Sequence, residues 1–224
     1  MRAIRSVELI LMGLVGLGLS KAVSAETFAM IGTGEVGSAL GPRFASLGHD
    51  IIYGSRSPDR EDVQALVAMT GNGALATTPF EAAQAADVVV LGLPWDVVED
   101  VVIGLGDLTG KIIIDPINPR AVDEEGWFDY PTHASNAERV QTLQPGAFVV
   151  KAFNSFGADT MVDSDMFDHT VTVLLAGNDA DSKVFVAELA EDLGFDTIDF
   201  GPVRYAHILE GLFLLRVNSG RQGR

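Results

Sequence analysis

The sequence contains no cysteine, and this absence excludes several classes of chemistry. Disulfide frameworks, thiolate nucleophiles and cysteine-based zinc or iron–sulfur centres all require the missing side chain. The four histidines are scattered without a spacing typical of metal ligands, so we expect each to be an ordinary surface or packing residue. The sequence therefore predicts no metal site.

Basic residues are also scarce. The chain has 15 lysines and arginines against 31 aspartates and glutamates, a formal net charge of -16, and a pI near 4.4. Nucleic acids and anionic membranes attract clusters of cationic side chains, which this composition does not supply. We therefore expect no nucleic-acid partner and interpret the acidity as a solvated exterior.

The apolar run near the N-terminus, Leu9–Leu19, is shorter than the roughly 20 residues that a membrane-spanning helix needs. It follows Arg2 and Arg5 and precedes the small residues 23–25, an order typical of a secretory signal peptide. We therefore expect residues 1–25 to direct export to the periplasm or the exterior, and no extended membrane domain. The alternative is a cytoplasmic protein with an N-terminal helical anchor or a non-native extension.

Beyond Ala25, short apolar runs alternate with amphipathic stretches, a pattern typical of repeated βα units around a parallel sheet. With 224 residues, 47% of them hydrophobic, the chain can bury one core. We expect an α/β fold with a Rossmann-like, doubly wound, mostly parallel sheet. It would form a single domain over 26–217 with a C-terminal βαβα extension, followed by a disordered tail over 218–224. The β-branched runs predict strands near Phe28–Ile31, Asp50–Tyr53, Ala74–Thr77, Val88–Gly92, Ile112–Asp115, Phe148–Lys151, Thr170–Ala176 and Asp196–Phe200.

Local chemistry marks two helix starts and one long loop. "TPFE" at 78–81 and "SNAE" at 135–138 both fit a capping box. The stretch 118–135 is polar and interrupted by proline and glycine, so it predicts a loop, and loops of this length in compact domains are often functional. Its acidic part, 123–131, is either a lid over a site or a solvated loop.

A glycine fingerprint follows the first predicted strand. Gly32, Gly34 and Gly37 stand in G-x-G-x-x-G order between this strand and a predicted helix. In that context the motif indicates a dinucleotide cradle: the first glycine permits the turn, the second lets the backbone approach the phosphates, and the third allows close helix–strand packing. The alternative is a glycine-rich turn without a ligand.

The second predicted strand ends in "YGSR", where a chain that binds NAD carries a carboxylate for the ribose 2′-hydroxyl. Ser55 and Arg56 occupy this position instead. A guanidinium fork and a hydroxyl suit a 2′-phosphate, which a carboxylate would repel. The pattern therefore predicts selectivity for NADP(H), unless Arg56 is simply a solvated turn residue.

Several separate motifs, in order, resemble one family. They are "GTGEVGSAL", "SLGHDIIYGSR", "LGLPW", "GKIIIDPINPR", "SNAERVQTL", "VVKAFNSFGA" and "DFGPVRYAHILE". The sequence over about Thr27 to Val217 resembles the NADP oxidoreductases that reduce coenzyme F420. It is also similar to the NADPH-binding reductase domain of the six-transmembrane metalloreductases, which passes hydride from NADPH to a flavin.

The resemblance implies roles for residues at several strand ends. Thr33, Glu35 and Val36 would line the pyrophosphate with the glycines, and Ser55 and Arg56 would bind the 2′-phosphate. The residues expected to lie near the nicotinamide, its ribose or the hydride acceptor are Leu93, Pro94, Trp95, Asn118, Pro119, Ala152, Phe153 and Asn154. Three features depart from the F420-dependent pattern: the acidic Glu35, the amide of Asn154 in place of a histidine, and a C-terminal segment cut short after Leu215.

Hydride transfer between cofactors needs alignment and exclusion of water more than a dedicated acid or base, so we predict no catalytic side chain. Trp95 either shields the ring stack or packs beneath the loop, and His207 with Glu210 fits a solvated contact on the last helix. The predicted function is an NADP-dependent oxidoreductase that transfers hydride between NADP(H) and F420, FAD or FMN, a small-molecule redox acceptor. The alternatives are a non-catalytic NADP(H)-binding sensor and a reductase of a small imine or acid. The sequence leaves a homodimer open.

Overall fold

The structure is a computed structural model that describes residues 25–130 and 133–221. The predicted signal segment, apart from Ala25, lies outside the described residues, as does the end of the predicted tail. None of the described helices combines the length and apolar composition needed to cross a membrane.

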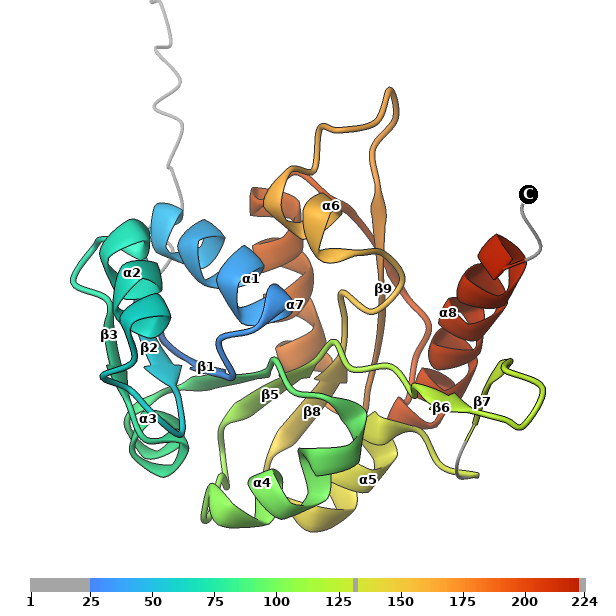
Figure 1. Ribbon diagram of the computed structural model, residues 1–224, viewed down its shortest axis with the longest axis horizontal. Helices are drawn as coiled ribbons and strands as arrows, with labels where there is room; N and C mark the ends of the chain where they lie inside the picture. Colours follow the sequence, from blue (N-terminus) through green and yellow to red (C-terminus); the bar gives the residue numbers. More distant parts are fainter. Residues whose placement is uncertain (1–24, 131–132, 222–224) are drawn as a thin grey trace, which may run out of the picture.

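Eight strands form one sheet in the order β10-β9-β8-β5-β4-β1-β2-β3 (Figure 1). All eight predicted strands are confirmed, with ends shifted by two residues at most. Their bounds are β1 Thr27–Ile31, β2 Asp50–Gly54, β3 Leu75–Thr77, β4 Val88–Leu91, β5 Ile112–Asp115, β8 Phe148–Lys151, β9 Thr172–Gly177 and β10 Asp196–Asp199. The pairs from β3 to β8 are parallel, as the predicted βα units require.

The predicted C-terminal extension continues the sheet in the opposite direction. Strand β9 pairs antiparallel with β8, and β10 pairs parallel with β9. The topology is therefore a doubly wound α/β sheet whose strand order reverses between β1 and β4, where open sheets of this kind bind ligands.

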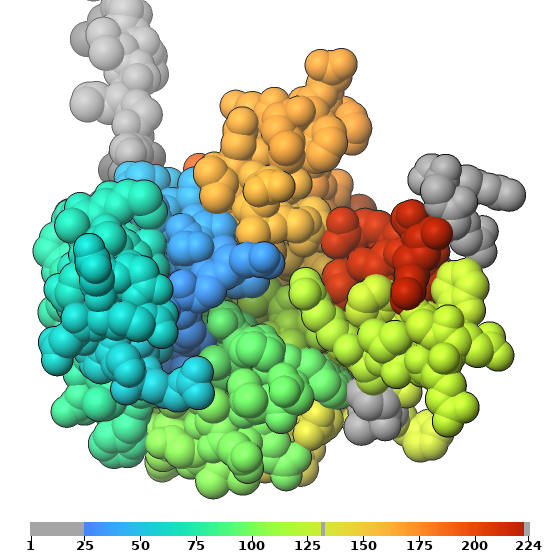
Figure 2. All heavy atoms as spheres, in the orientation of Figure 1, coloured from blue at the N-terminus to red at the C-terminus, as the bar shows by residue number. Residues whose placement is uncertain are grey.

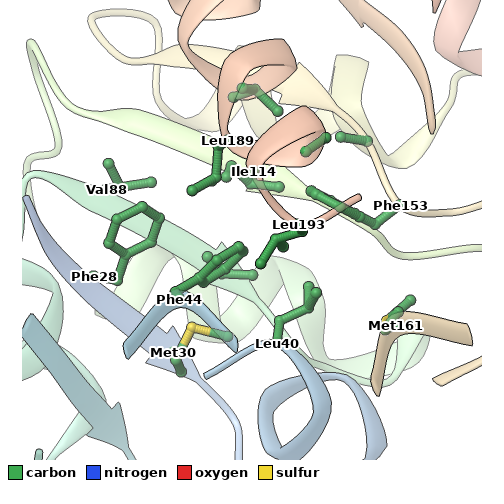
Figure 3. Packing of buried hydrophobic residues seen from close by; sticks show 14 of the residues in the cluster. Phe28, Met30, Leu40, Phe44, Val88, Ile114, Phe153, Met161, Leu189 and Leu193 are labelled. Atoms are coloured by element: carbon green, nitrogen blue, oxygen red, sulfur yellow. The ribbon is translucent and has the colours of Figure 1, made fainter. Parts of the chain in front are cut away.

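Helices cover both faces of the sheet, and the sheet separates two buried clusters. Their bounds are α1 Glu35–Ser46, α2 Glu61–Thr70, α3 Pro79–Ala85, η1 Trp95–Val97, α4 Val98–Gly104, α5 Asn136–Leu143, α6 Ala158–Val162, α7 Ala180–Asp192, η2 Val203–Tyr205 and α8 Ala206–Arg221. Because successive strand residues face opposite sides, Phe28 and Met30 join the cluster under α1 and α7, shown in Figure 3, while Ala29 and Ile31 join the cluster over α3, α4, α5 and α8.

The two predicted capping boxes are confirmed. At α3 the Glu81 amide donates to Thr78 Oγ1 at 3.3 Å and the Thr78 amide donates to Glu81 Oε2 at 3.2 Å. At α5 the same exchange joins Ser135 and Glu138 at 3.2 and 2.9 Å. Each box satisfies amides that the first helical turn leaves without partners.

Two expectations for irregular segments need correction. The predicted loop 118–135 contains a small antiparallel hairpin, β6 Ala121–Val122 with β7 Phe128–Asp129. The tail is not disordered over 218–221, where α8 continues. The physical reason is the amide of Asn218, whose Oδ1 accepts from the Phe128 amide and whose Nδ2 donates to the Phe128 carbonyl, each at 2.9 Å. These two hydrogen bonds join the end of α8 to the hairpin.

Candidate functional site

The glycine turn after β1 is closely packed at two of its three glycines. Gly32 has a φ of 104°, and a Cβ there would lie 2.2 Å from the Gly92 carbonyl oxygen at the end of β4. A Cβ on Gly37 would lie 2.1 Å from the Gly32 carbonyl oxygen. Both positions therefore exclude any side chain for reasons of backbone geometry and packing.

Gly34 differs, because a Cβ at this position would meet nothing within 4 Å. The residue is the N-cap of α1, and no side chain caps the helix there. The first amides of a helix have no partner inside it, and the helix dipole places partial positive charge at this end. Gly34 thus leaves open space beside amides suited to a pyrophosphate, as the predicted role requires.

A cleft of about 810 Å³ opens at the carboxyl ends of β1, β4, β5 and β8. It corresponds to the hollow at the centre of the face in Figure 2, between α1, the segment after β4, the hairpin and α8. Eight of the predicted residues line it: Gly34, Glu35, Val36, Leu93, Pro94, Trp95, Asn118 and Phe153. The structure therefore brings together residues that are up to 119 positions apart in the sequence, counted from Gly34 to Phe153.

The other eight predicted residues do not line the cleft. Gly32 and Thr33 belong to the turn that leads into α1, Gly37 lies in the first part of α1, and Pro119, Ala152 and Asn154 flank lining residues in the sequence. Ser55 and Arg56 follow β2, beside the turn, where the Gly32 amide donates to the Gly54 carbonyl at 3.0 Å. They lie at the end of β2, which is next to β1, the strand that leads into the glycine turn.

Ser55 and Arg56 differ in their surroundings. Ser55 is 7% exposed, and its hydroxyl accepts from the Ser57 amide at 3.2 Å. Arg56 is exposed and has no hydrogen bond or ion pair with any residue in the described ranges. Its guanidinium is therefore free to bind an anion at the tip of β2.

Trp95 lies where both of its predicted roles remain open, at the cleft wall and against the buried core. Its side chain lines the cleft and also packs against the buried cluster on the α4 and α5 side of the sheet. The Arg139 guanidinium lies 5.1 Å from the centre of its ring and is itself paired with Glu99 at 2.8 Å. This contact holds the indole at the cleft wall.

Asn118 and Asn154 form a reciprocal pair at the ends of β5 and β8. Asn154 Nδ2 donates to Asn118 Oδ1 at 2.9 Å, and Asn118 Nδ2 donates to the Asn154 carbonyl at 2.7 Å. Asn154 Nδ2 also donates to the Leu209 carbonyl of α8 at 3.0 Å. Asn118 reaches the cleft, whereas Asn154 is buried behind it and positions Asn118.

Phe153, between β8 and this asparagine, has an uncommon backbone. Its φ is 59°, a value that costs a non-glycine residue free energy, and its side chain is fully buried within the cleft wall. Such strained residues persist where the surrounding packing fixes them, often at binding sites. The conformation turns the chain so that Asn154 faces Asn118.

Sequence reasoning missed a buried charge cluster behind the cleft. Lys151 Nζ lies 2.7 Å from Glu210 Oε1 and 3.2 Å from Asp115 Oδ2, and all three side chains have no exposed surface. Lys151 also donates to the Ile117 carbonyl, and Asn136 Nδ2 donates to Asp115 Oδ1 at 3.0 Å. A lysine inside the apolar run "FVVKAF" was the available signal, because buried lysines are almost always paired.

Glu210 therefore does not form the solvated contact with His207 that the sequence suggested. Burial raises the pKa of its carboxyl to about 7, an effect that Lys151 opposes and Asp115 increases. His207 instead stacks on Tyr130, with ring centres 4.3 Å apart. Burial also raises the pKa of the Tyr130 hydroxyl, with further contributions from the charges of Glu210 and Glu138.

The chemistry of the cleft wall is mainly apolar. Its buried lining comprises Leu91, Pro116, Ile117, Phe153, Met161 and Phe213, none of which ionises. The ionisable lining residues, Glu35, Asp96, Arg120 and Arg216, are all exposed. Within 25–130 and 133–221, no group of three or more acidic, histidine or cysteine side chains could hold a metal ion.

A doubly wound sheet with a glycine turn at its reversal point and a cleft over its strand ends defines a Rossmann-type domain of the NADP-dependent oxidoreductases. The family profile described as "NADP oxidoreductase coenzyme F420-dependent" matches residues 27–119. The chain belongs to this family, as the extent of its similarity to one relative shows.

That relative is the F420-dependent NADP reductase of Methanothermobacter thermautotrophicus, which is 30% identical over 207 residues, 86% of this chain and 88% of the relative. The rat metalloreductase STEAP3 is 27% identical over 188 residues, 84% of this chain, but the match spans only 36% of that protein. The chain therefore spans about a third of the metalloreductase.

Solved structures share this fold. A structure from Arthrobacter sp. FB24, described as an F420-dependent NADP-reductase, has a TM-score of 0.79 at 28% identity and covers 89% of this chain and 96% of its own. A reductive aminase from Aspergillus terreus in complex with NADPH has a TM-score of 0.63 at 19% identity, with 89% of this chain and 62% of its own covered. The second similarity shows the fold alone.

Proposed function

We propose that this protein transfers hydride between NADP(H) and a flavin or deazaflavin acceptor. The observation that supports this most strongly is the single cleft that extends from Gly34 at the start of α1 to Asn118 and Phe153 at the ends of β5 and β8. Its volume of about 810 Å³ lies in the range of small-molecule and cofactor sites.

The residues fit a dinucleotide phosphate. The open space at Gly34 and the first amides of α1 would hold the pyrophosphate, and Ser55 with Arg56 would bind the 2′-phosphate. NADPH, when bound, supplies the hydride. Asn118, held by Asn154, would orient the reacting end, and the apolar wall would exclude water from it.

The composition of the wall supports hydride transfer without an acid or base. Reduction of an imine or a keto acid requires a proton donor beside the substrate, whereas hydride transfer between ring cofactors depends chiefly on alignment. The buried lining residues described above do not ionise. This argues for a flavin-type acceptor over the small imine or acid, and a non-catalytic sensor remains the alternative for an experiment to test.

An acceptor screen tests the proposal. NADPH oxidation is followed by absorbance after addition of F420, FAD, FMN, a ferric chelate or a cyclic imine. The amount of NADPH consumed is compared with the amount of acceptor reduced. We expect stoichiometric oxidation with at least one flavin or deazaflavin. NADPH binding without oxidation by any acceptor would favour the sensor, and oxidation with the imine alone would favour the imine reductase.

The location of the protein is a separate proposal. We infer from the pattern of 1–25 that this segment directs export, with cleavage after Ala25. Mass determination of the N-terminus in the native host tests it. A chain that starts at Glu26 is the expected result, and an intact Met1 start would reject export by cleavage.

A further inference from the structure

The acceptor end of the cleft contains two arginines to which no role has yet been given, Arg120 and Arg216. We propose that together they bind a phosphate ester on the hydride acceptor. This inference rests on the proposed function, because it assigns a chemical class to the acceptor of that same cleft.

The two arginines come from distant segments and meet at one ring. Arg120 directly precedes β6, and Arg216 lies in α8, 96 residues later. Their guanidinium carbons lie 6.0 and 5.5 Å from the ring centre of Phe213. Both also line the cleft. The fold therefore gathers two permanent positive charges around one aromatic side chain at the cleft mouth.

Neither arginine forms an ion pair with a described residue. Arg60 and Arg139 pair with carboxylates, and Arg43 donates to backbone carbonyls at 2.7 and 3.3 Å. The guanidinium groups of Arg120 and Arg216, in contrast, have no hydrogen bond or ion pair within 25–130 and 133–221. In a chain where acidic residues outnumber basic ones by 31 to 15, two arginines without a paired carboxylate at one aromatic ring form an uncommon cationic surface.

Their place in the sheet separates them from the phosphates of the dinucleotide. Ser55 and Arg56 follow β2, on one side of β1, whereas Arg120 follows β5 on the other side and α8 packs against β7 and β9. Figure 1 shows α8 and β6 at the opposite side of the molecule from β2. Asn118, two residues before Arg120, marks the reacting end between the two groups. The arginines thus lie where an acceptor would extend away from NADPH.

A phosphate ester fits this pair better than a neutral tail. Guanidinium groups bind phosphate oxygens through paired, charge-assisted hydrogen bonds. Riboflavin and FMN contain the same reacting ring and differ only in the 5′-phosphate, so the two molecules isolate the contribution of this group. The proposal requires the protein to prefer FMN over riboflavin because of Arg120 and Arg216.

The experiment measures KM for FMN, riboflavin and NADPH in the wild type, Arg120→Ala, Arg216→Ala and the double variant. Arg204→Ala is the matched control, because Arg204 is an exposed arginine stacked on Tyr205 at 5.1 Å and does not line the cleft. We expect KM for FMN to rise about tenfold for each cleft arginine removed. KM for riboflavin and for NADPH should stay within about twofold of the wild type in these variants. In Arg204→Ala all three KM values should do so.

Equal KM values for FMN and riboflavin in the wild type would overturn the inference, as would a double variant that raises KM for NADPH instead.

If only deazaflavins are reduced, F420 and its phosphate-free ribityl deazaflavin core replace the two flavins. If no acceptor is reduced, the proposed function fails, and flavin-fluorescence titrations with NADP⁺ present still test the arginines. Tighter binding of FMN than riboflavin, lost in the double variant, supports the subsite, and equal binding in the wild type rejects it.

Discussion

Lys151 Nζ lies 2.7 Å from Glu210 Oε1, and both side chains are without exposed surface. This ion pair joins β8 to α8 across 59 residues of sequence, and Asp115 at the end of β5 completes it. Isolated charges of this kind are strongly disfavoured in a protein interior, so each of the three groups depends on the others. The cluster fixes α8 against the sheet directly behind the cleft.

Lys151→Met should lower the free energy of unfolding by about 3 to 5 kcal/mol at pH 8, because it leaves Asp115 and Glu210 buried without a cation. Lys183→Met is the matched control, since Lys183 pairs with the half-exposed Asp199 at 2.7 Å and exposed pairs contribute less than about 1 kcal/mol. Urea unfolding measures both. Equal losses in the two variants would contradict a special role for the buried cluster.

The carboxyl of Glu210 should make stability depend on pH in a defined direction. Its pKa is about 7 in the folded protein against 4.5 ordinarily, so between these values the folded state binds the additional proton. The contribution of this group to the free energy of unfolding therefore falls as pH rises from 4.5 to 7, and it is smallest above pH 7. Lys151 and Asp115 face the carboxyl of Glu210, and the charge of Glu210 in turn contributes to the raised pKa of Tyr130.

Glu210→Gln removes this titration. Relative to the wild type, the variant should gain about 3 kcal/mol of unfolding free energy as pH rises from 4.5 to 8. Urea unfolding at four or five pH values measures the difference between the two proteins, in which the other acidic groups cancel. Parallel curves over the whole range would show that Glu210 has no raised pKa.

The glycine turn offers a pair of variants with opposite defects. Gly37→Ala should destabilise the fold, because its Cβ would lie 2.1 Å from the Gly32 carbonyl oxygen. Gly34→Ala should keep the wild-type Tm, since its Cβ meets no protein atom within 4 Å, yet should weaken NADPH binding at least tenfold by occupying the space of the pyrophosphate. Thermal unfolding and NADPH titration separate the two effects. Unchanged NADPH affinity in Gly34→Ala would place the dinucleotide elsewhere.

Selectivity for NADP(H) should depend on Arg56. Arg56→Asp should weaken NADPH binding by about two orders of magnitude and NADH binding much less, because the new carboxylate repels only the 2′-phosphate. Arg60→Asp makes the same charge change four residues away at an exposed arginine that already pairs with Asp62, and should leave both affinities near wild type. Fluorescence titrations measure the four constants. Equal losses for both dinucleotides in Arg56→Asp would refute this role.

The sheet could be predicted from the sequence because each strand is specified locally. β-Branched runs such as "IIID" and "VVVL" are buried on both faces in a parallel sheet, and the capping residues at 78–81 and 135–138 act within one helical turn. The glycine turn was equally local. These features need no knowledge of the distant parts of the chain.

The rest depends on contacts between distant segments. The partners of Lys151 lie 36 and 59 residues away, and the hydrogen bonds that keep 218–221 helical reach Phe128 across 90 residues. The cleft residues of α8 and the region after β8, such as Phe213 and Met161, are apolar positions that a sequence pattern assigns to the core. Their exposure to a cavity follows only from the assembled layers.

Helix α8 places Glu210 in the buried charge cluster and Phe213 and Arg216 at the cleft. The glycine turn and the tip of β2 belong to the other half of the strand order, which begins at β1. If NADP(H) and the acceptor bind as proposed, cofactor choice and acceptor choice reside in separate portions of one polypeptide. Descendants of a common ancestor could exchange their final helix, and with it their electron-accepting partner, without losing the half that recognises the reductant.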